Sequence, residues 1–562
     1  MSIPSCFRGR ALAAAAALLL MLCPSVVAAQ GTTVVPSTDL AYPDIDRLAE
    51  LGVLDSVIIG QRPYSRREIG RIVRVARDRL DRSDRLAGLR DAISDAAATQ
   101  ASGIIQRLAS RFEESEERDY EGPVFALLDG MSLTFNSTDA IRRGFPAVHT
   151  RRTEATIDPL AYRRLGDPAV RGQSTALDLS QRFEPTHWLA WHARERLEYR
   201  APRDSTQTKT HGELLLAGMR VRSHNVVLLV GREQLAWSQS ANDGLFLASD
   251  APALDQISLS ADRPFELPGV LRRLGPTQAT VLYADLGASA VRSHSRLVAY
   301  KVSVQPHSSV ELGGTFMDHF GGAGARPTSV GNLLVDMMPF IDIFRRHNYY
   351  DSTRTADVDS DKLLGIDGRW RIEALAGLTI TGEVLIDDFD IHRLAYMFSG
   401  YGSSNVGLLF PQIRAPELSM KLWAKHMGIV TYTHQVVANG VTTRGRLLGD
   451  ELGPDAKAFG GDLRWMPAPS MRLTLRGYSA QYSSGEYASY YADADSTRFV
   501  VYKTSSGINE LRDGGIGTLE LQDENGLALV LRAGAERIRH ADFIPDARRK
   551  SYVASAALRL RM

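Results

Sequence analysis

The stretch "LTITGEVLI" (Leu378–Ile386) alternates apolar and polar side chains almost residue by residue. Its apolar members fall on one side of an extended chain: Leu378, Ile380, Val384 and Ile386. Its polar members fall on the other side: Thr379, Thr381 and Glu383. Because successive side chains of a β-strand point to opposite faces, this period of two predicts a strand with one apolar and one polar face.

The same alternation recurs in "LVAYKVSV" (Leu297–Val304), "MRLTLRGY" (Met471–Tyr478) and the final "LRLRM" (Leu558–Met562). Alternation alone would also fit a soluble sandwich with one wet face. The polar faces of these segments carry Lys, Arg and Glu, which suits a polar lumen behind a lipid-facing apolar band. No stretch after Glu121 approaches the ~18 consecutive apolar residues of a membrane helix. The sequence therefore predicts an all-β transmembrane antiparallel barrel over residues 121–562.

The first 29 residues have the pattern of a secretory signal peptide. Two arginines, Arg8 and Arg10, precede the apolar run 11–22, and Val27 and Ala29 fit the small-residue rule for cleavage. The apolar run is too short to cross a bilayer of about 30 Å. We expect cleavage after Ala29 and export of the rest of the chain.

Cleavage at this point would remove Cys6 and Cys23, the two cysteines of the chain. The exported protein would then have no disulfide and no thiolate metal site. Losing two arginines and no acid shifts the formal charge from +1 to −1. A balance so close to zero offers no global field for nucleic acid.

Residues 30–120 are predicted to form a helical periplasmic head and a linker. Ile45, Leu48 and Leu51 lie at helical spacing, and Ser65 and Glu68 have the spacing of a capping box. A third helix is expected between residues 86 and 112. The arginine-rich stretch 61–90 suggests either an anionic partner, such as periplasmic export machinery, or a solvated helix face.

Several segments, in order, resemble the Wzi-type capsule assembly family of outer-membrane proteins. They are "AYPDIDRLAELGVL" (41–54), "GQRPYSRREIGRIV" (60–73), "GREQLAWSQSANDGLFLASDAPALDQISLS" (231–260), "LGPTQATVLYADLG" (274–287) and "LLGIDGRWRIEALAGLTITGEVLIDDF" (363–389). The resemblance implies a monomeric barrel of about eighteen antiparallel strands with a small helical bundle on the periplasmic side. It implies a protein of the cell outer membrane that contacts membrane lipid and holds or organises capsular polysaccharide without catalysis or a cofactor. "AWSQSANDG" departs from the family's bulkier aromatic and glycine-rich run, so glycan specificity does not follow.

The central stretch "GREQLAWSQSANDGLFLASDAP" (231–252) is a candidate polysaccharide-binding lip. Trp237 would offer a flat apolar face to a sugar ring. Four neighbours would offer hydrogen-bond donors and acceptors: Arg232, Gln234, Asn242 and Asp243. Alternatively, Trp237 belongs to an interfacial aromatic girdle and Asn-Asp-Gly is simply a turn.

A second candidate region follows at residues 363–392. Asp367 and Arg369 alternate onto one face and could line a lumen. Asp387 begins a carboxylate cluster with Asp388 and Asp390 that could bind polysaccharide or Ca²⁺. The cluster lacks the spacing of a calcium-binding loop, so an acidic strand end is the preferred interpretation and no metal site is predicted.

Catalytic signatures are scarce in this sequence. Neither HExxH nor GxSxG occurs, and Asp318 and His319 form an adjacent acid and histidine pair of the kind that arises by chance. The prediction is a protein that is not an enzyme. Two alternatives stay open: a channel for small polar solutes, and a barrel hydrolase that uses Asp318 and His319.

Overall fold

The structure is a computed structural model. It describes residues 33–85, 95–112, 123–140, 143–147, 150–157, 171–203, 208–239, 244–249, 251–288, 292–325, 360–387, 402–428, 431–432, 441–483, 486–491, 499–504, 507–524 and 526–561. The predicted signal peptide, residues 1–29, lies outside these ranges.

Within the described residues the main sheet has nineteen strands, and it closes on itself because β1 (Val124–Thr138) pairs with both β4 and β25. β8 and β9 (Phe265–Glu266) both pair with β10 and share one place, so the barrel has eighteen positions. The other barrel strands are β4 (Gly172–Thr186), β5 (Leu189–Pro202), β6 (Lys209–Ser223), β7 (Val226–Glu233), β8 (Leu254–Ala261), β10 (Pro276–Asp285), β11 (Arg296–His307), β12 (Val310–Phe320), β13 (Ser360–Ile372), β14 (Leu378–Asp387), β15 (Ser403–Phe410), β16 (Leu418–Met427), β19 (Ala456–Ala468), β20 (Met471–Tyr482), β23 (Glu510–Gln522), β24 (Ala528–Arg539) and β25 (Arg548–Arg561). Each pairs antiparallel with its neighbours in chain order. The predicted antiparallel barrel of about eighteen strands is confirmed.

Alternating side chains divide between the outside of the barrel and its lumen. On β11, Val302 is 43% exposed whereas Lys301 and Ser303 are fully buried. Many large apolar side chains are exposed in the same way: Leu133, Leu197, Ile366, Leu475 and Leu558. An apolar outer face around a polar interior is the arrangement of a membrane barrel and the reverse of a soluble sandwich.

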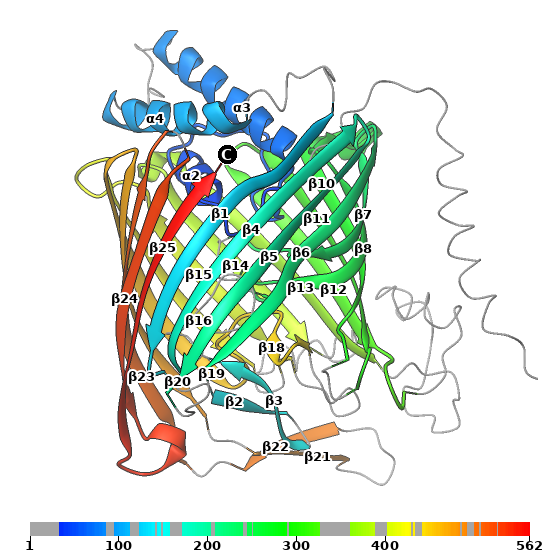
Figure 1. The fold of residues 1–562 in the computed structure, drawn as a ribbon, viewed down its shortest axis with the longest axis vertical. Coiled ribbons are helices and arrows are strands. Elements are labelled where there is room, and N and C mark those ends of the chain that lie inside the picture. Colours follow the sequence, from blue (N-terminus) through cyan, green and yellow to red (C-terminus); the bar gives the residue numbers. More distant parts are fainter. Residues whose placement is uncertain are drawn as a thin grey trace, which may run out of the picture.

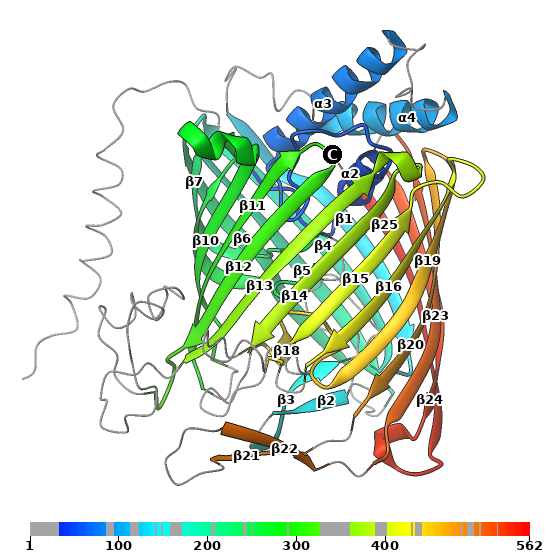
Figure 2. The ribbon, with the colours of Figure 1, turned by 180° about the vertical axis from the view of Figure 1, so that it is seen from behind.

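The two ends of the barrel differ (Figures 1 and 2). At the end that carries the helices and the C-terminus, which we call the helical end, strands join through short turns such as 224–225, 308–309 and 469–470. At the opposite end, the loop end, connections such as 321–359 and 428–455 are longer. Three small hairpins lie in these longer connections: β2 (Arg143–Ala147) with β3 (Thr150–Ile157), β17 (Thr442–Thr443) with β18 (Arg446–Leu447), and β21 (Glu486–Tyr491) with β22 (Phe499–Thr504). Outer-membrane barrels have short periplasmic turns and longer extracellular loops, which supports the proposed periplasmic placement of the helical end.

The described part of the chain places three helices at the helical end: α2 (Ala41–Glu50), α3 (Arg66–Arg85) and α4 (Asp95–Phe112). Their predicted apolar stripes form one core. It contains Ile45, Leu48, Leu51, Ile69, Ile72, Val73, Ala101, Ile104, Leu108 and Phe112. Ser65 begins α3 as predicted, because its Oγ accepts a hydrogen bond from the backbone N–H of Glu68 at 3.1 Å. No described helix combines the length and the apolar composition that a transmembrane helix needs.

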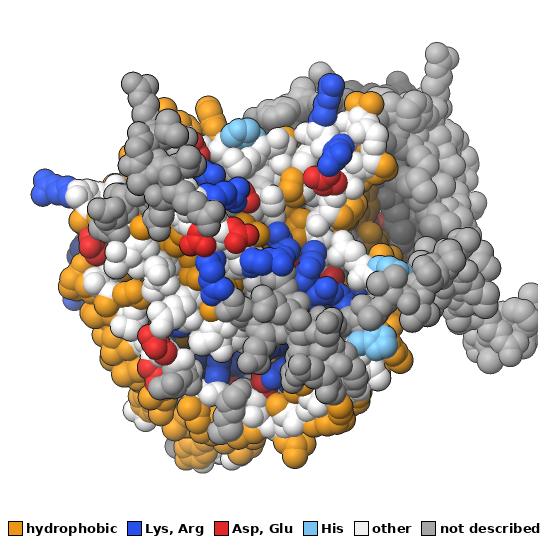
Figure 3. All heavy atoms as spheres, turned by 90° about the horizontal axis from the view of Figure 1, so that it is seen from above, with side chains coloured by type: hydrophobic (Ala, Val, Ile, Leu, Met, Phe, Trp, Pro, Cys, Tyr) orange, Lys and Arg blue, Asp and Glu red, His pale blue; other side chains and the backbone are white. Residues whose placement is uncertain are grey.

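The free face of the head is basic. Figure 3 shows Lys and Arg side chains gathered in the middle of the helical end, bordered by apolar side chains of the barrel rim. Three arginines of α3 are exposed: Arg74, Arg77 and Arg82. The expected charge pattern of α3 is thus present on a surface, where solvent or an anionic partner can reach it.

Candidate binding site in the barrel lumen

Two stretches of chain fold into the lumen from the loop end. The first inner segment, residues 234–239 and 244–249, follows β7, and the second, residues 441–452, follows β16. Both join a buried apolar cluster on the inner wall, which includes Trp237, Leu245, Phe246, Leu247, Leu448, Leu282, Ala299, Met317, Leu363 and Leu385. A backbone hydrogen bond of 2.9 Å from Ala248 to Leu448 links the two segments. Packed chain therefore covers the part of the lumen wall that these residues form.

Inward carboxylates of β14 hold the inner chain through backbone groups, Glu383 directly and Asp387 through Tyr432, which precedes the second inner segment. Glu383 accepts a hydrogen bond from the N–H of Leu245 at 3.0 Å, and Asp387 accepts one from the N–H of Tyr432 at 2.6 Å. Tyr432 in turn accepts a hydrogen bond at its hydroxyl from the N–H of Asp450 at 3.0 Å. A buried backbone donor needs such a partner, so these carboxylates fix where the inner chain runs.

A buried ion pair stands at the base of the first inner segment. Lys301 of β11 is fully buried and its ammonium contacts the carboxylate of Asp367 on β13. The side-chain amide of Gln239 donates to Asp367 at 2.8 Å and to Glu311 at 3.0 Å. These wall residues thus clamp the end of the described part of the first inner segment.

The helical head reaches the same place from the opposite side. The N–H groups of Ile59 and Gly60 donate to the carboxylate of Glu311 at 2.9 and 2.8 Å. Arg62 and Ala236 exchange two backbone hydrogen bonds of 2.9 and 3.0 Å, so the head and the first inner segment form a short antiparallel bridge. The lumen is therefore occupied continuously, from the helices to the inner apolar cluster, along this side of the barrel.

Ion pairs fasten α2 to the barrel wall. Asp44 lies between Arg107 of α4, at 2.9 Å, and Arg472 of β20. Arg472 also pairs with Glu520 of β23 at 2.6 Å, and all four side chains are buried or nearly so. A guanidinium shared between two carboxylates satisfies charges that would otherwise be costly inside the protein.

Glu50 at the end of α2 is the second fastening point. Its carboxylate accepts hydrogen bonds of 2.7 and 2.8 Å from Arg464 of β19 and one of 3.0 Å from Arg47. Burial alone would raise the pKa of Glu50, but the two guanidinium groups outweigh that effect and hold the pKa at about 2. The head is therefore docked through an ionised carboxylate.

This pKa predicts that docking of the head is sensitive to acid. Because the pKa of Glu50 is lowered from 4.5 to about 2, its contribution to stability is complete above pH 4.5 and is lost as the pH falls towards 2. Protection of residues 33–112 from an acid-active protease should decline across that interval. In Glu50→Gln the head should be docked more weakly at neutral pH, because Arg464 loses its charged partner. The decline in protection on acidification should therefore be smaller in this variant. An equally large decline in both proteins would contradict the assignment.

A polar cavity of about 360 Å³ remains beside the packed inner chain. Of its lining residues, ten are Lys or Arg and five are Asp or Glu, and they are interspersed with Ser and Thr hydroxyls. The cavity extends from Glu50 of the head to Asn136, two residues before the end of β1 at the loop end. Its volume lies in the range of ~300–1,000 Å³ that is usual for ligand pockets.

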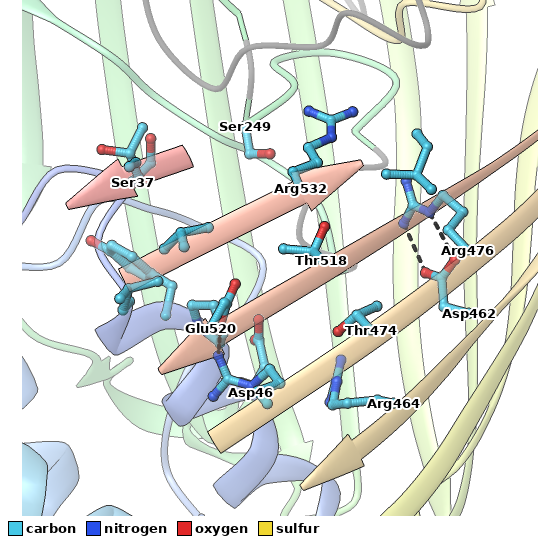
Figure 4. Close-up of a pocket in the computed structure, with 18 of the residues that line it drawn as sticks. Ser37, Asp46, Ser249, Asp462, Arg464, Thr474, Arg476, Thr518, Glu520 and Arg532 are labelled. Atoms are coloured by element: carbon cyan, nitrogen blue, oxygen red, sulfur yellow. Dashed lines mark hydrogen bonds and ion pairs between the residues drawn. The ribbon is translucent and has the colours of Figure 1, made fainter. Parts of the chain in front are cut away.

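Neighbouring strands contribute alternate side chains to this cavity (Figure 4). Thr474 and Arg476 of β20, Thr518 of β23 and Arg532 of β24 point into the same space, which Ser249 of the first inner segment also borders. Arg476 is held by Asp462 through two hydrogen bonds of 2.7 Å. The wall therefore presents guanidinium groups and hydroxyls, which are the groups that bind carboxylates and sugar hydroxyls.

The residues predicted as a binding lip lie in different places. Arg232 is on the outer face of the barrel, where it forms a bidentate pair with Asp255 at 2.7 Å. Trp237 is only 1% exposed, in neither a sugar-facing lip nor a lipid-facing girdle. The amide of Gln234 donates to the carbonyls of Ser249 and Ala251, both at 2.7 Å. Asn242 and Asp243 lie outside the described residues, between two ends of the first inner segment that are both buried.

The second predicted group is split as well. Asp367 and Asp387 are buried and engaged in the contacts described above, whereas Arg369 lines the cavity and makes no hydrogen bond or ion pair with any described residue. Asp388 and Asp390, the proposed partners of Asp387, fall outside the described residues. In the described ranges no three His, Cys, Asp or Glu side chains are grouped closely enough to hold a metal ion.

Asp318 and His319 are adjacent on β12, so their side chains point to opposite faces of the sheet. His319 lies 3.0 Å from the hydroxyl of Ser295, and both residues are fully buried. Residues that the sequence did not single out are more prominent: Glu50, Glu311, Arg464 and Arg532. Strand alternation could have identified Glu311, Arg464 and Arg532 as inward-facing. No local sequence pattern indicated that Glu50 would dock the head.

A closed barrel with an apolar exterior, a helical head docked into one end and a polar interior defines an outer-membrane barrel protein. The model of the family described as "Capsule assembly protein Wzi" matches residues 143–512, and the chain belongs to that family. The predicted family and outer-membrane location are thereby confirmed. No curated protein sequence matches the chain significantly.

Solved structures resemble the chain at low sequence identity. Wzi of Escherichia coli, described as an outer membrane protein involved in group 1 capsule assembly and a carbohydrate-binding β-barrel, is 14% identical with a TM-score of 0.63. The match covers 94% of this chain and 99% of that one. OprD and OpdQ of Pseudomonas aeruginosa have TM-scores of 0.42 and 0.40 and identities of 8% and 9%. They cover 79% and 78% of this chain and 97% of each of those chains.

Proposed function

We propose that this protein binds capsular polysaccharide at the outer membrane and does not transform it. The observation that carries the proposal is the lumen: packed chain fills one side, and the remaining space is a cavity lined by guanidinium groups and hydroxyls. Family membership and the description of Escherichia coli Wzi as a carbohydrate-binding barrel support the same function. We propose that it acts as a monomer, with the exposed arginines of α3 available to export machinery.

The composition of the cavity favours an acidic polymer. Arg369 and Arg532 would pair with uronic carboxylates, since guanidinium groups bind carboxylates in bidentate fashion. Thr379, Thr381, Thr474 and Thr518 would exchange hydrogen bonds with sugar hydroxyls. We therefore propose that a few residues of a polysaccharide chain enter the cavity from the loop end.

The predicted lip residues then have two roles. Arg369, which lines the cavity, is a proposed direct contact, and so are Asn242 and Asp243, because Gln239 and Ser249 on either side of them border the cavity. Gln234, Trp237, Asp367 and Asp387 are proposed to hold the inner chain that forms one wall. Arg232, on the outer face, is proposed to contact glycan only where it passes over the rim.

The channel alternative is not favoured, because the helical head and the inner segments occupy the path that a solute would take. The hydrolase alternative finds no support at the residues named for it, since His319 and the neighbouring Ser295 are both buried. Binding without turnover is the function that remains consistent with this geometry.

A deletion strain tests the proposed function. We expect total capsular polysaccharide to be unchanged while the cell-bound fraction falls and the fraction in the medium rises. Complementation with the intact gene should restore the partition. Wild-type retention in the deletion strain would refute the proposal.

Substitution within the cavity tests the site. Arg369→Gln/Arg532→Gln should weaken binding of isolated capsular polysaccharide by at least about 100-fold, because each of the two charge-assisted hydrogen bonds contributes ~1.5–3 kcal/mol. Titration of the purified proteins with the polysaccharide measures this change. The control is Arg272→Gln/Arg273→Gln, which removes two exposed arginines from the 3-10 helix Gly269–Leu274 at the helical end. Equal affinity of both variants would place the site outside the cavity.

A further inference from the structure

Four basic side chains cluster on the outer face of the barrel at the loop end of β24 and β25. They are Arg537, Arg539, Arg548 and Lys550, and all four are exposed. The strand register places Arg537 directly opposite Lys550 and Arg539 directly opposite Arg548. We call this group the outer basic cluster; the hairpin that carries it is seen in Figure 1.

The protein itself balances little of this charge. Arg539 pairs with Asp513 of β23 at 3.0 Å. Arg537, Arg548 and Lys550 make no hydrogen bond or ion pair with any residue that the structure describes. Like charges directly opposite each other on a sheet are destabilising, so an external anion would stabilise the cluster.

The height of the cluster indicates which anion this is. The outward side chains of β25 run from Leu560 through Leu558 and Tyr552 to Lys550. With a rise of ~3.4 Å per residue and a strand tilt of ~40°, Tyr552 stands about 21 Å and Lys550 about 26 Å above Leu560 along the membrane normal. The apolar band of such barrels is ~25 Å tall and ends in aromatic residues. Tyr552 therefore marks the edge of the hydrocarbon, and the cluster lies at the level of the lipid headgroups.

Two other outward basic residues at the loop end lack these features. Arg232 is neutralised by its bidentate pair with Asp255, and Lys457 stands alone on β19. Below the cluster, the outer face of the hairpin is apolar, with Leu531 and Leu558 exposed. A ligand of this surface would thus have anionic groups at its head and hydrocarbon below them.

We propose that the outer basic cluster binds the phosphate groups of the phosphorylated glycolipid that forms the outer leaflet of this membrane. The guanidinium groups of the cluster pair with the phosphate oxygens, and the acyl chains of the glycolipid lie along the apolar face of β24 and β25. Free phosphate would gain nothing from the apolar strip, and a capsular polysaccharide would have no acyl chains to place there. This site is separate from the proposed polysaccharide cavity, because its side chains point away from the lumen.

The test uses the full-length protein in detergent micelles and two forms of one probe, diphosphoryl lipid A and dephosphorylated lipid A. The wild-type protein should bind the diphosphoryl form at least 10-fold more tightly than the dephosphorylated form. Arg537→Gln/Lys550→Gln should lose that preference, and Arg272→Gln/Arg273→Gln, which removes the same charge at the helical end, should keep it. Capsular polysaccharide binding should be unchanged in both variants.

Three results would overturn the proposal. The first is that Arg537→Gln/Lys550→Gln keeps the full preference for diphosphoryl lipid A, and the second is that the wild-type protein has no such preference. The third is that Arg537→Gln/Lys550→Gln loses polysaccharide binding and keeps lipid A binding. The last would assign the cluster to the polysaccharide instead. Should the first variant fail to fold, Arg539→Gln/Arg548→Gln, judged by the same criteria, replaces it, with folding checked by heat-dependent gel mobility.

Discussion

Replacing Arg472 with alanine is expected to release the helical head from the barrel. Arg472 joins Asp44 of α2 to Glu520 of β23, and its side chain is only 4% exposed. Its removal leaves two buried carboxylates short of a positive charge, a change that costs ~3–5 kcal/mol when a buried pair is broken. The cost falls on the contact between the head and the barrel wall, because the strands keep their own hydrogen bonds.

Two measurements report this release. The head, residues 33–112, should become sensitive to protease in the folded, detergent-solubilised barrel, and conductance in planar bilayers should rise because the head no longer fills the helical end. Arg476→Ala is the matched control. Arg476 lies on the same face of β20 and also forms an ion pair, half-buried in this case, but its partner Asp462 belongs to the barrel wall. If both variants behave alike, the effect reflects general damage to β20, and docking through Arg472 is not supported.

Replacing Lys301 with alanine is expected to destabilise the inner chain. Lys301 is fully buried and compensates Asp367, which also accepts a hydrogen bond from Gln239. Removing the ammonium leaves a buried carboxylate without its counter-charge, at a cost of ~3–5 kcal/mol. Gln239 would then lose its fixed acceptor, and the first inner segment should detach from the wall. The expected result is a clearly lower unfolding temperature in detergent.

A double substitution separates the charge effect from simple loss of packing. Lys301→Met/Asp367→Leu should recover much of the lost stability, since well-packed apolar residues often replace a buried ion pair at no net cost. Lys457→Ala, at an exposed outward lysine of β19, should change stability by less than ~0.5 kcal/mol. A double variant as unstable as Lys301→Ala would show that this site needs the charges themselves.

The barrel and the helical head could be predicted because their signals are local. Period-two alternation in "LTITGEVLI" and "LVAYKVSV" assigned each side chain to one face, and Lys301 and Glu383 do face the lumen. The helical stripe of Ile69, Ile72 and Val73 likewise became the core of the head. In both cases a residue's face depends only on its neighbours along the chain.

The contents of the lumen could not be predicted in this way. "AWSQSANDG" looks like an exposed polar loop, yet Trp237 is buried because the wall opposite supplies partners for the segment. The N–H of Leu245 finds its acceptor in Glu383, 138 residues away, and Asp44 finds Arg472 across 428 residues. Alternation predicts that a side chain faces inward, but it carries no information on which residues that side chain contacts in the lumen.

The last strand and the beginning of the head are joined directly. Arg561, at the end of β25, pairs with Asp39, and Arg559 donates to the carbonyl of Thr38 at 3.1 Å. The part of the head that is synthesised first therefore acquires these partners only after the final strand has been made and has paired with β1. Completion of the chain and docking of the head at the helical end thus become one event, so that an unfinished barrel lacks these contacts with its head.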